Sequence, residues 1–555
     1  MFIFFIPLTL LVTFLFSTCY VAPFLARALG HVVGWYLHRK TEGRRSLILA
    51  RVQVEEEDYK SNGRHDSASE DDGDWERVES DAASSSNGDK ADREWEGIVG
   101  FFHPFCNAGG GGERVLWAAI RATQKKYPKA VCVVYTGDHE ADKATILERV
   151  KTRFNIHLHS PTMLFLYLST RHYVLSTTYP HFTLLGQSLG SLILAYDAFS
   201  LLVPDIFIDT MGYAFTLAFS KLLFPKVPTG AYVHYPTIST DMLGSLDTAT
   251  EEGGQGVNAG TGKGLKGYAK RKYWHLFARL YSWVGGSVDV VMTNSSWTQN
   301  HIRILWGPSR VARHKTSEVS VVFPPVAVEE LEQEIDVSRE SEKSRQKILL
   351  YIAQFRPEKN HALILQAFSE FMNSPTTDED LKSTQLVLIG SVRNSEDATR
   401  VYDLRLLAHE LHIKESVTFI CDATWPEILT NLRRSSVGVN GMWNEHFGIG
   451  VVEYQAAGLI SVVNASGGPK NDIVVEYDGG PTGFHATTPS EFASGFKQAL
   501  SLSPEDKLAM RLRARESAKR FTEAAFARLW LVQMDRLVAF QVGWSGRLPK
   551  RAERC

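Results

Sequence analysis

The chain has 555 residues, of which 44% are hydrophobic and 11% aromatic, which is enough apolar material for more than one core. A chain of this length is expected to hold about two to four domains. The formal net charge of −2 gives no overall basic character, which disfavours nucleic acid as a partner. The five cysteines are scattered without CxxC spacing, so the sequence predicts neither a disulfide framework nor a zinc site.

The chain begins with an apolar segment. Residues 2–26 contain no charged side chain, and a helix needs about 20 apolar residues to cross a bilayer. There is neither a basic start nor a small-residue cleavage site, so we predict an uncleaved anchor rather than a cleaved signal peptide. Five basic residues follow between Arg27 and Arg45, and the positive-inside rule then places the rest of the chain in the cytosol. The anchor and its basic flank together span residues 1–45.

Residues 46–96 are predicted to form an acidic, disordered tether. From residue 55 to residue 96 the composition shifts to Asp, Glu, Ser, Gly and Asn. So little apolar surface cannot offset the entropy that is lost on ordering. An acidic tail that binds a partner is the alternative.

Two series of short apolar strands follow, each alternating with helical patterns. The first series lies at residues 98–102, 130–135, 205–209, 230–234, 288–293 and 320–326, the last ending in a proline pair. The second lies at 348–354, 385–389, 417–420, 437–439 and 460–463. This alternation predicts parallel sheets covered by helices on both faces. We predict two doubly wound α/β domains, residues 97–325 and 326–520, followed by a C-terminal helix and tail at 521–555. Ligands of such folds bind outside the carboxyl ends of the strands, here in a cleft between the domains.

Three segments allow two interpretations. Residues 188–203 are strongly apolar but contain Asp197, which favours a buried or interfacial helix over a second membrane crossing. Residues 266–283 mix basic and aromatic residues at helical spacing, which suits either a helix on an anionic membrane surface or a domain-packing helix with a solvated basic side. Residues 521–537 fit either a helix that returns to the first domain or an ordinary C-terminal helix.

The first motif is FFHPFCNAGGGGERVLW, which spans residues 101–117. Its glycines lie between a predicted strand and a predicted helix, but the sequence has neither the Lys-Ser/Thr of a P-loop nor G-x-G-x-x-G spacing. A bare backbone at a helix N-terminus favours an anion and allows it to approach closely. We therefore predict that Gly109, Gly110, Gly111 and Gly112 contact a phosphate-bearing ligand, with a tight structural turn as the alternative.

The second motif is NEHFGIGVVEYQAAG, in which Glu445 and Glu453 have E-x7-E spacing. Glu445 lies in the loop after a strand, and Phe447, Gly448 and Ile449 open a helix that carries Glu453. A carboxylate in the loop accepts hydrogen bonds from sugar hydroxyls, and one on the helix binds a ribose diol. The free N–H groups at the start of the helix hold a phosphate between them.

The third motif is YIAQFRPEKNH, residues 351–361, in which Arg356 and Lys359 follow the end of a strand. Two cations at this place would neutralise a diphosphate leaving group, which is the main electrostatic task in breaking a sugar–phosphate bond. No DxD-type metal signature stands at a strand end, so no metal site is predicted.

Together these motifs resemble the retaining glycosyltransferases of family four, which have the GT-B architecture of two facing Rossmann-like domains. The segments AYVHYPTIS, AQFRPEKNH, MWNEHFGIGVVE and SGGPKNDIV, with the glycine motif, are similar to the α-1,2-mannosyltransferases of lipid-linked oligosaccharide assembly. The resemblance implies GDP-mannose as donor and a dolichol-pyrophosphate-linked oligosaccharide as acceptor, which receives its fourth and fifth mannoses. It also implies transfer with retained anomeric configuration and without a cofactor or an obligatory metal. The implied location is the cytosolic face of the endoplasmic reticulum membrane, and the implied partners include other mannosyltransferases of the pathway.

The resemblance assigns roles by position. Glu445 would contact the donor hexose, Glu453 the ribose, and Arg356 with Lys359 the diphosphate, while His234 would lie beside the transferred sugar. In the family an arginine directly follows a glycine at the strand end, whereas Ala353-Gln354 stand there in this chain, so that Arg356 would substitute from two residues later. The alternatives are a GT-B transferase with another nucleotide sugar and a non-catalytic scaffold that binds lipid-linked glycans.

Overall fold

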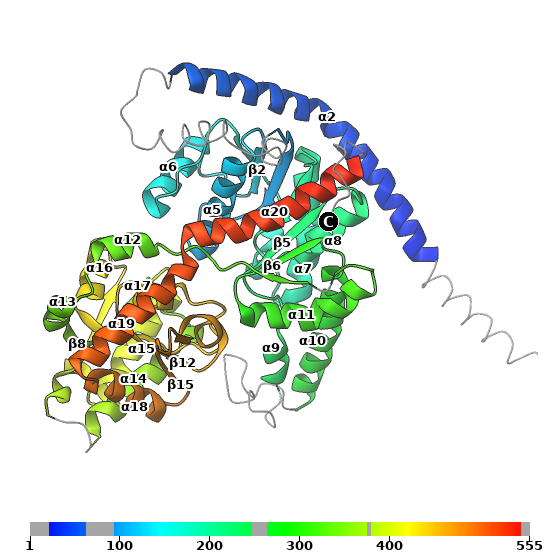
Figure 1. Ribbon diagram of the computed structural model, residues 1–555. Coiled ribbons are helices and arrows are strands. Elements are labelled where there is room, and N and C mark those ends of the chain that lie inside the picture. The colour runs from blue at the N-terminus through cyan, green and yellow to red at the C-terminus, as the bar shows by residue number, and fades with distance from the viewer. Residues whose placement is uncertain (1–20, 63–93, 247–263, 317, 375–378, 546–555) are drawn as a thin grey trace, which may run out of the picture.

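The computed structural model of the protein describes residues 21–62, 94–246, 264–316, 318–374 and 379–545. Two lobes lie side by side, each built around a parallel sheet, and the last helix of the chain runs from one to the other (Figure 1). We call them the first and the second domain. The alternation of strands and helices predicts these two doubly wound domains, and the family resemblance implies their GT-B arrangement.

The first domain contains a seven-stranded parallel sheet in the order β3-β2-β1-β4-β5-β6-β7. Alternate residues of β1 enter different cores: Ile98 and Phe102 join one cluster, and Val99 and Phe101 the other. The sheet is therefore covered on both faces, which explains why its strands are short and almost wholly apolar. The strands are β1 (Ile98–Phe102), β2 (Val131–Thr136), β3 (Met163–Tyr167), β4 (Ile206–Asp209), β5 (Thr229–Val233), β6 (Val290–Thr293) and β7 (Ser320–Val321). The helices are α5 (Gly111–Lys126), α6 (Lys143–Phe154), α7 (Thr183–Leu201), α8 (Ala214–Leu223), α9 (Thr240–Gly244), α10 (Gly264–Gly285) and α11 (Ser296–Val311).

The second domain repeats this design with a six-stranded parallel sheet in the order β10-β9-β8-β11-β12-β15. Ile348 and Leu350 of β8 face one core, and Leu349 and Tyr351 face the other. Its strands are β8 (Gln346–Ile352), β9 (Gln385–Gly390), β10 (Val417–Cys421), β11 (Ser435–Asn440), β12 (Ile460–Asn464) and β15 (Gly483–Ala486), with a small antiparallel pair β13 (Glu476–Tyr477) and β14 (Gly480–Pro481). Its helices are α12 (Val328–Glu334), α13 (Arg339–Ser344), α14 (His361–Asn373), α15 (Ser395–Glu410), α16 (Trp425–Arg434), α17 (Ile449–Ala456), α18 (Pro489–Ser501) and α19 (Pro504–Ala518).

The strand orders place the predicted motifs at the two points where ligands bind to such sheets. The chain order reverses between β1 and β4 in the first domain and between β8 and β11 in the second. A crevice opens outside the carboxyl ends of the strands at such a switch point. His103 and Thr210 follow β1 and β4, while the motif with Lys359 and the loop with Glu445 follow β8 and β11.

The last helix, α20 (Glu523–Ser545), returns to the first domain and lies along α5 (Figure 1). The indole Nε1 of Trp530 donates a hydrogen bond to Thr123 Oγ1 at 3.0 Å. The carboxylate of Asp535 accepts hydrogen bonds from Lys126 at 2.6 Å and from the Tyr127 hydroxyl at 2.5 Å. The interpretation of residues 521–537 as a returning helix is therefore correct.

The first described helix, α2 (Ala22–Asn62), is continuous and packs against α7 and α8. The prediction of a disordered tether is therefore wrong for residues 46–62. Arg45 forms an ion pair of 2.6 Å with Asp205, and further along α2 Glu55 forms one of 2.8 Å with Lys143. Apolar residues become scarce only from residue 55, and Ile48 and Val52 join the core of the first domain. Composition also could not reveal the charged partners on the first domain that hold the helix in place. Residues 1–20 of the predicted anchor and residues 63–93 of the tether lie outside the described residues.

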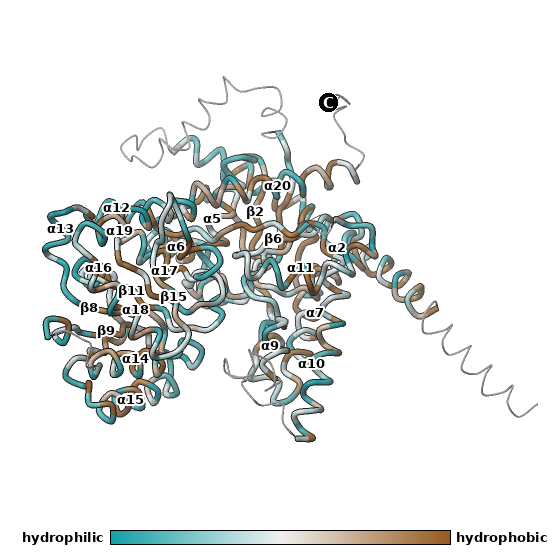
Figure 2. Tube along the Cα trace, turned by 60° about the horizontal axis from the view of Figure 1, so that its bottom comes forward, coloured by the Kyte–Doolittle hydropathy of each residue, from teal (hydrophilic) through white to brown (hydrophobic). Residues whose placement is uncertain are grey.

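The apolar helix α7 lies in the first domain (Figure 2) and packs against α2 and α8. It is the single helix in the described part of the chain that is long and apolar enough to cross a membrane by length and composition, and 39% of its most apolar window is buried. The Asp197 carboxylate accepts hydrogen bonds from the backbone N–H groups of Ser169 at 2.8 Å and Thr170 at 3.1 Å. These contacts are those of a helix packed within a domain, as the presence of Asp197 in the apolar run suggests.

Candidate active site

Lys359 and Glu445 form an ion pair at the switch point of the second domain. The ammonium Nζ of Lys359 lies 2.5 Å from Glu445 Oε2, and the two side chains are only 21% and 14% exposed. The Tyr351 hydroxyl donates to the carbonyl oxygen of Lys359 at 2.5 Å and fixes the turn that carries it. Burial alone would raise the pKa of Glu445, but the charge and hydrogen bond of Lys359 outweigh it and lower the pKa. Glu445 is therefore ionised at neutral pH.

Glu453 lies on α17, eight residues after Glu445, and its pKa is shifted in the opposite direction. The helix begins after Gly448, whose φ of 107° lies in the left-handed region that favours glycine. The Glu453 side chain is half-buried, and burial raises its pKa to about 7, an effect that the charge of Arg114 on α5 partly offsets. The electrostatic partner of Glu453 thus comes from the first domain, across the junction.

The glycine loop faces the start of α17. A Cβ on Gly111 would lie 2.4 Å from Cδ1 of Ile449, and one on Gly112 would lie 3.8 Å from His234 Nε2. Gly109 has a φ of 79°, again in the left-handed region. The bare backbone thus permits a close approach between the two domains.

One of the four glycines differs from the prediction. The N–H of Gly110 donates to Glu113 Oε2 at 2.5 Å, so this N–H is occupied by a side chain of the protein and does not point to a ligand. This contact is one half of a capping box, in which the side chain of the third helical residue accepts a hydrogen bond from the backbone N–H of the residue that precedes the helix. Glu113 therefore holds the glycine loop at the N-terminus of α5.

Glu113 also connects the loop to a buried histidine, His103, that sequence reasoning missed. His103 Nε2 lies 3.6 Å from Glu113 Oε1, and His103 Nδ1 is 2.7 Å from Thr210 Oγ1. Burial would raise the pKa of Glu113, but the nearby ring of His103 and the hydrogen bond from the Gly110 N–H lower it. His234 is neutral at physiological pH because burial, and next the charge of His103, lower its pKa to about 4. The signals were in the sequence: a polar His directly after an apolar strand, and a Glu three residues after a helix cap.

Contacts between the domains surround this group. The ring of His446 stacks on Tyr235 at a centroid distance of 4.0 Å and lies 5.4 Å from Trp297. Asn444 Nδ2 donates to Asp241 Oδ2 at 2.6 Å, so the loop that carries Glu445 is bound directly to α9. These pairs join the two domains beside the Lys359–Glu445 pair.

The side chains of two predicted residues, Arg356 and Phe447, make contacts outside the Lys359–Glu445 pair. Arg356 Nη1 is 3.7 Å from Glu358 Oε1, and both side chains are partly exposed. Among the described residues, Arg356 forms this ion pair and none with Glu445. The side chain of Phe447 is buried in the second core, where its ring contacts Phe323 and Phe521, so a ligand would meet only its backbone. Arg356 is therefore the least supported of the predicted donor contacts.

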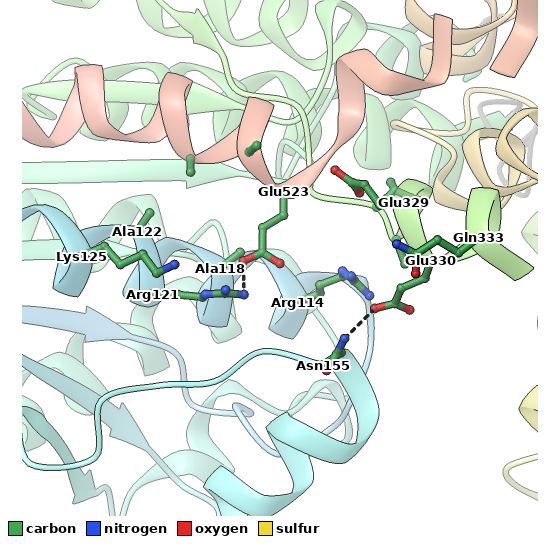
Figure 3. A pocket seen from close by; sticks show the side chains of 14 residues that line it. Arg114, Ala118, Arg121, Ala122, Lys125, Asn155, Glu329, Glu330, Gln333 and Glu523 are labelled. Atoms are coloured by element: carbon green, nitrogen blue, oxygen red, sulfur yellow. Dashed lines mark hydrogen bonds and ion pairs between the residues drawn. The ribbon is translucent and has the colours of Figure 1, made fainter. Parts of the chain in front are cut away.

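A charged pocket of about 410 Å³ lies between α5, α12 and α20. Figure 3 shows that Arg114 and Arg121 of α5 face acidic side chains of α12 and α20 there. Arg121 forms an ion pair of 3.1 Å with Glu523, and Asn155 donates to Glu330 at 3.3 Å. The charge of Arg114 also lowers the pKa of Glu453. The pocket therefore lies next to the junction between the domains, on the side of the Glu453 carboxyl group.

Comparison with known proteins agrees with this geometry. Residues 96–306 match the family described as ALG11 mannosyltransferase N-terminus, and residues 332–521 match the glycosyl transferases group 1 family. A Neurospora crassa protein named GDP-Man:Man(3)GlcNAc(2)-PP-Dol alpha-1,2-mannosyltransferase is 64% identical over 529 residues, 94% of each chain. Proteins of the same name from Mus musculus and Homo sapiens are each 45% identical, over 80% and 79% of this chain and 87% of theirs.

Solved structures share the fold at low identity. A glycosyltransferase from Rickettsia africae has a TM-score of 0.52 at 13% identity and covers 80% of this chain and 99% of its own. Sucrose-phosphate synthase from Thermosynechococcus elongatus has a TM-score of 0.54 at 14% identity and covers 80% and 98%. This likeness establishes the two-domain GT-B fold, and the curated relatives establish the family. The chain belongs to the family of GDP-Man:Man(3)GlcNAc(2)-PP-Dol alpha-1,2-mannosyltransferases.

Proposed function

We propose that the protein is a retaining α-1,2-mannosyltransferase that moves mannose from GDP-mannose to a dolichol-pyrophosphate-linked oligosaccharide and adds its fourth and fifth mannoses. The observation that carries this function is the 64% identity to a relative of that name across 94% of both chains. The intact Lys359–Glu445 pair supports catalysis rather than a scaffold role, because a protein that only binds glycans has no need of it.

Donor binding is proposed to occur in the cleft between α5 and α17. The N–H groups at the start of α17 and the ammonium of Lys359 would hold the diphosphate, because helix N-termini and fixed cations favour anions. Glu445 would accept hydrogen bonds from the hexose, and Glu453 from the ribose. A diphosphate beside Lys359 would pair with the ammonium group of that residue. The Glu445 carboxylate, which is paired with Lys359 at 2.5 Å, would then be free to turn towards the sugar hydroxyls.

In the transfer step the bond between the anomeric carbon and the phosphate oxygen breaks, and GDP leaves with the electron pair. The acceptor hydroxyl attacks the same face, and its proton passes to the departing phosphate. The neutral ring of His234 supports a place beside the sugar, because its buried Nε2 has no hydrogen-bond partner among the described residues and is available to accept from a sugar hydroxyl. Lys359 and the helix N-terminus would take the place of a divalent metal ion.

The proposed location is the endoplasmic reticulum membrane, with residues 2–26 as a single-pass anchor and both domains in the cytosol. The absence of charge in residues 2–26 and the basic residues after them support this orientation. The site would then stand on the side of the membrane where cytosolic GDP-mannose is available.

The test is release of GDP from GDP-mannose by the purified full chain with a synthetic lipid-pyrophosphate trimannosyl acceptor. We expect products one and two hexoses longer, with or without a chelator. Glu445→Gln and Lys359→Met should each lower turnover by at least about tenfold, the scale of losing one charge-stabilising contact. Lys382→Met is the control, because its ion pair with Glu379 lies on the exposed surface.

Two results would contradict the proposal. If the chain releases no GDP while Glu445→Gln still supports glycan assembly in cells, the scaffold alternative is correct. If it releases nucleotide from another sugar donor and not from GDP-mannose, the chain is a GT-B transferase with a different substrate.

A further inference from the structure

We propose that Glu113, His103 and Thr210 are positioning residues that hold His234 in the tautomer with its proton on Nδ1, so that Nε2 accepts a hydrogen bond from the transferred sugar. The contact with the sugar rests on the proposed function, whereas the tautomer is a property of the folded chain alone. We call these four residues the polar chain. Glu113 lies in α5, and the other three directly follow β1, β4 and β5 in the first domain.

The polar chain begins at the glycine loop. Glu113 is the third residue of α5, and its Oε2 accepts a hydrogen bond from the N–H of Gly110. Its other oxygen, Oε1, lies 3.6 Å from His103 Nε2. Because its pKa is lowered in spite of burial, Glu113 is ionised at neutral pH, and an ionised carboxylate only accepts hydrogen bonds.

This carboxylate determines which nitrogen of His103 carries a proton. The ring of His103 is fully buried, and its Nε2 has no hydrogen-bond partner among the described residues, so the carboxylate of Glu113 dominates its surroundings. An unprotonated Nε2 would direct its lone pair at the carboxylate oxygen, and the two would repel each other. In the neutral ring the proton therefore lies on Nε2, and Nδ1 is left as an acceptor.

Thr210 is the next link of the polar chain. It is fully buried, and its Oγ1 lies 2.7 Å from His103 Nδ1. Since Nδ1 is an acceptor, the Thr210 hydroxyl donates to it. The backbone N–H of Thr210 also donates to the carbonyl oxygen of Phe102 at 3.4 Å. The two contacts hold Thr210 from its side chain and from its backbone, and so fix the direction of its carbonyl group.

The carbonyl group of Thr210 selects the tautomer of His234. Burial, and next the charge of His103, lower the pKa of His234 to about 4, while a hydrogen bond from its ring to the Thr210 backbone opposes them. A carbonyl oxygen only accepts, so the ring nitrogen that faces it carries the proton. Nε2 of His234 has no hydrogen-bond partner among the described residues, so the protonated nitrogen is Nδ1.

The unprotonated nitrogen faces the same glycine loop at which the polar chain begins. A Cβ on Gly112 would lie 3.8 Å from His234 Nε2, so the bare backbone leaves space in front of this atom. A buried acceptor without a partner needs a donor from outside the described residues. A sugar hydroxyl supplies one, whereas the other tautomer would present an N–H and leave the proton of that hydroxyl without an acceptor.

The direction of the links favours a functional role over plain packing. From the Gly110 N–H to the His234 ring, each described donor meets an acceptor, and the one acceptor left open is His234 Nε2. Apolar side chains at positions 103 and 210 would fill the same space without the cost of burying polar groups. The polar chain therefore serves its open end, at the site where the glycine loop approaches α17.

The experiment determines the protonation of the ring nitrogens by nuclear magnetic resonance. The full chain is labelled with a heavy nitrogen isotope in its histidine rings and studied in detergent at neutral pH without donor. Signals are assigned to His234 and His103 by their loss in His234→Gln and His103→Gln. In the parent chain we expect His234 to be protonated on Nδ1 and unprotonated on Nε2, and His103 to be protonated on Nε2.

Variants of Thr210 test its link to His234. Thr210→Val removes the hydroxyl that holds the residue, and we expect a second set of His234 signals with the proton on Nε2. Thr210→Ser restores the hydroxyl and should restore the parent signals. Thr216→Val is the matched control, because Thr216 is also fully buried and its hydroxyl also forms a hydrogen bond of 2.7 Å, to the carbonyl oxygen of Tyr213 outside the polar chain. It should leave the His234 signals unchanged.

Glu113→Gln tests the start of the polar chain. The amide donates as well as accepts, so it no longer requires a proton on His103 Nε2, and signals of both His103 tautomers should appear. His361 is the internal control in every sample. It is also buried, with a pKa lowered by burial to about 4, but lies in the second domain, and its signals should not move.

Addition of GDP-mannose connects the tautomer to binding. The donor should shift the Nε2 signal of His234 in the parent chain. In Thr210→Val the dissociation constant should rise by up to the reciprocal of the fraction of His234 that keeps Nε2 unprotonated. Thr210→Ser and Thr216→Val should bind as the parent chain does. A parent chain that binds no GDP-mannose would contradict the proposed function, while the spectra recorded without donor still decide the tautomer.

Three outcomes would overturn the proposal. One is a parent chain in which the His234 proton lies on Nε2. Another is a His103 ring without a proton on Nε2, or one whose signals are the same in Glu113→Gln. The third is a Thr210→Val variant with parent signals for His234 and parent affinity for the donor, which would reduce the polar chain to a packing feature.

Discussion

The two glutamates of the E-x7-E motif differ in ionisation because their neighbours differ. Glu445 is buried next to the ammonium of Lys359, and this charge lowers its pKa in spite of burial. Glu453 is also shielded from water, but its cationic neighbour, Arg114, offsets only part of the effect, and its pKa is raised to about 7. Sequence spacing alone predicts two similar carboxylates, whereas the folded site contains one fixed anion and one group that titrates near neutrality.

This difference predicts a pH dependence of donor binding. Below its pKa of about 7, Glu453 is protonated and loses acceptor capacity for the ribose hydroxyls. We expect the dissociation constant of GDP-mannose to rise by about tenfold between about pH 8 and about pH 6, because the ionised fraction falls by that factor. Titration calorimetry with the full chain at both pH values measures it.

Two variants identify the group responsible. Glu453→Gln should bind the donor with little dependence on pH over this range. Arg114→Met removes the charge that lowers the pKa of Glu453 and should move the midpoint to higher pH. A pH dependence that survives Glu453→Gln unchanged would assign it to another residue.

The individual site residues were predictable to different degrees. Lys359 and Glu445 follow the ends of adjacent strands, β8 and β11, and the prediction that strand ends converge in a parallel sheet places them together. Glu113 was not predictable as a partner of His103, because that contact depends on how α5 approaches the end of β1. Arg356 was predicted from its place after the end of a strand, and in the structure its side chain pairs with Glu358.

At the scale of elements, α2 shows the limit of composition as a guide. Its residues 55–62 are mostly charged and look unable to fold alone, yet the helix gains order from partners on the first domain. Close packing also depends on glycine: a Cβ on Gly34 would lie 2.0 Å from the carbonyl oxygen of Leu223 on α8. The helix therefore lies against the α8 backbone because position 34 has no side chain.

We expect Gly34→Val to lift α2 from α8. Overpacking of this kind costs about 1–3 kcal/mol. Hydrogen exchange of the backbone amides at residues 44–56 should become faster, because the ion pairs with Asp205 and Lys143 lose their alignment. Mass spectrometry of the exchanged peptides gives this measurement.

Gly43→Ala is the matched control in the same helix. A Cβ on Gly43 meets nothing within 4 Å, so only helix propensity changes. Alanine in an exposed helix interior is favoured over glycine by about 1 kcal/mol, so exchange in this region should slow. Equal exchange in the two variants would show that Gly34 does not set the approach of α2.

Two strands of the sheets were missed for a physical reason. β3 lies at the edge of its sheet, and four of its five residues are only partly buried. β15 reads GFHA and carries little apolar material, because it too is an edge strand with one neighbour. Central strands, covered on both faces, leave the continuous apolar runs from which the fold class was predicted.

For the whole molecule, the question is what holds the two domains around the cleft. The returning helix α20 joins them on one side, beside the charged pocket lined by Arg121 and Glu523 (Figure 3). Around the site itself the domains meet through aromatic and polar contacts, such as the stack of His446 on Tyr235 and the hydrogen bond between Asn444 and Asp241.

The contact between Asn444 and Asp241 is the most specific of these polar links. Asn444 has a φ of 53°, so glycine is the replacement that removes the side chain without straining the backbone. Asp241 keeps a hydrogen bond from Trp297 Nε1 at 3.2 Å and an ion-pair distance of 3.4 Å to His301, so the variant leaves no unpaired carboxylate. Only the link across the cleft is lost.

We expect Asn444→Gly to open the domains when no donor is bound. Loss of a hydrogen bond to a charged group costs about 1.5–3 kcal/mol, which is enough to shift an equilibrium between closed and open forms by at least about tenfold. Small-angle X-ray scattering should give a larger radius of gyration for the variant than for the parent chain, and GDP-mannose should restore the parent value. The KM for the donor should rise more than the turnover number falls, since closure is then driven by donor binding.

His412→Gly, which removes a side chain at a φ of 58° on the exposed surface of the second domain, should change neither quantity. An unchanged radius in Asn444→Gly would mean that α20 alone sets the domain arrangement.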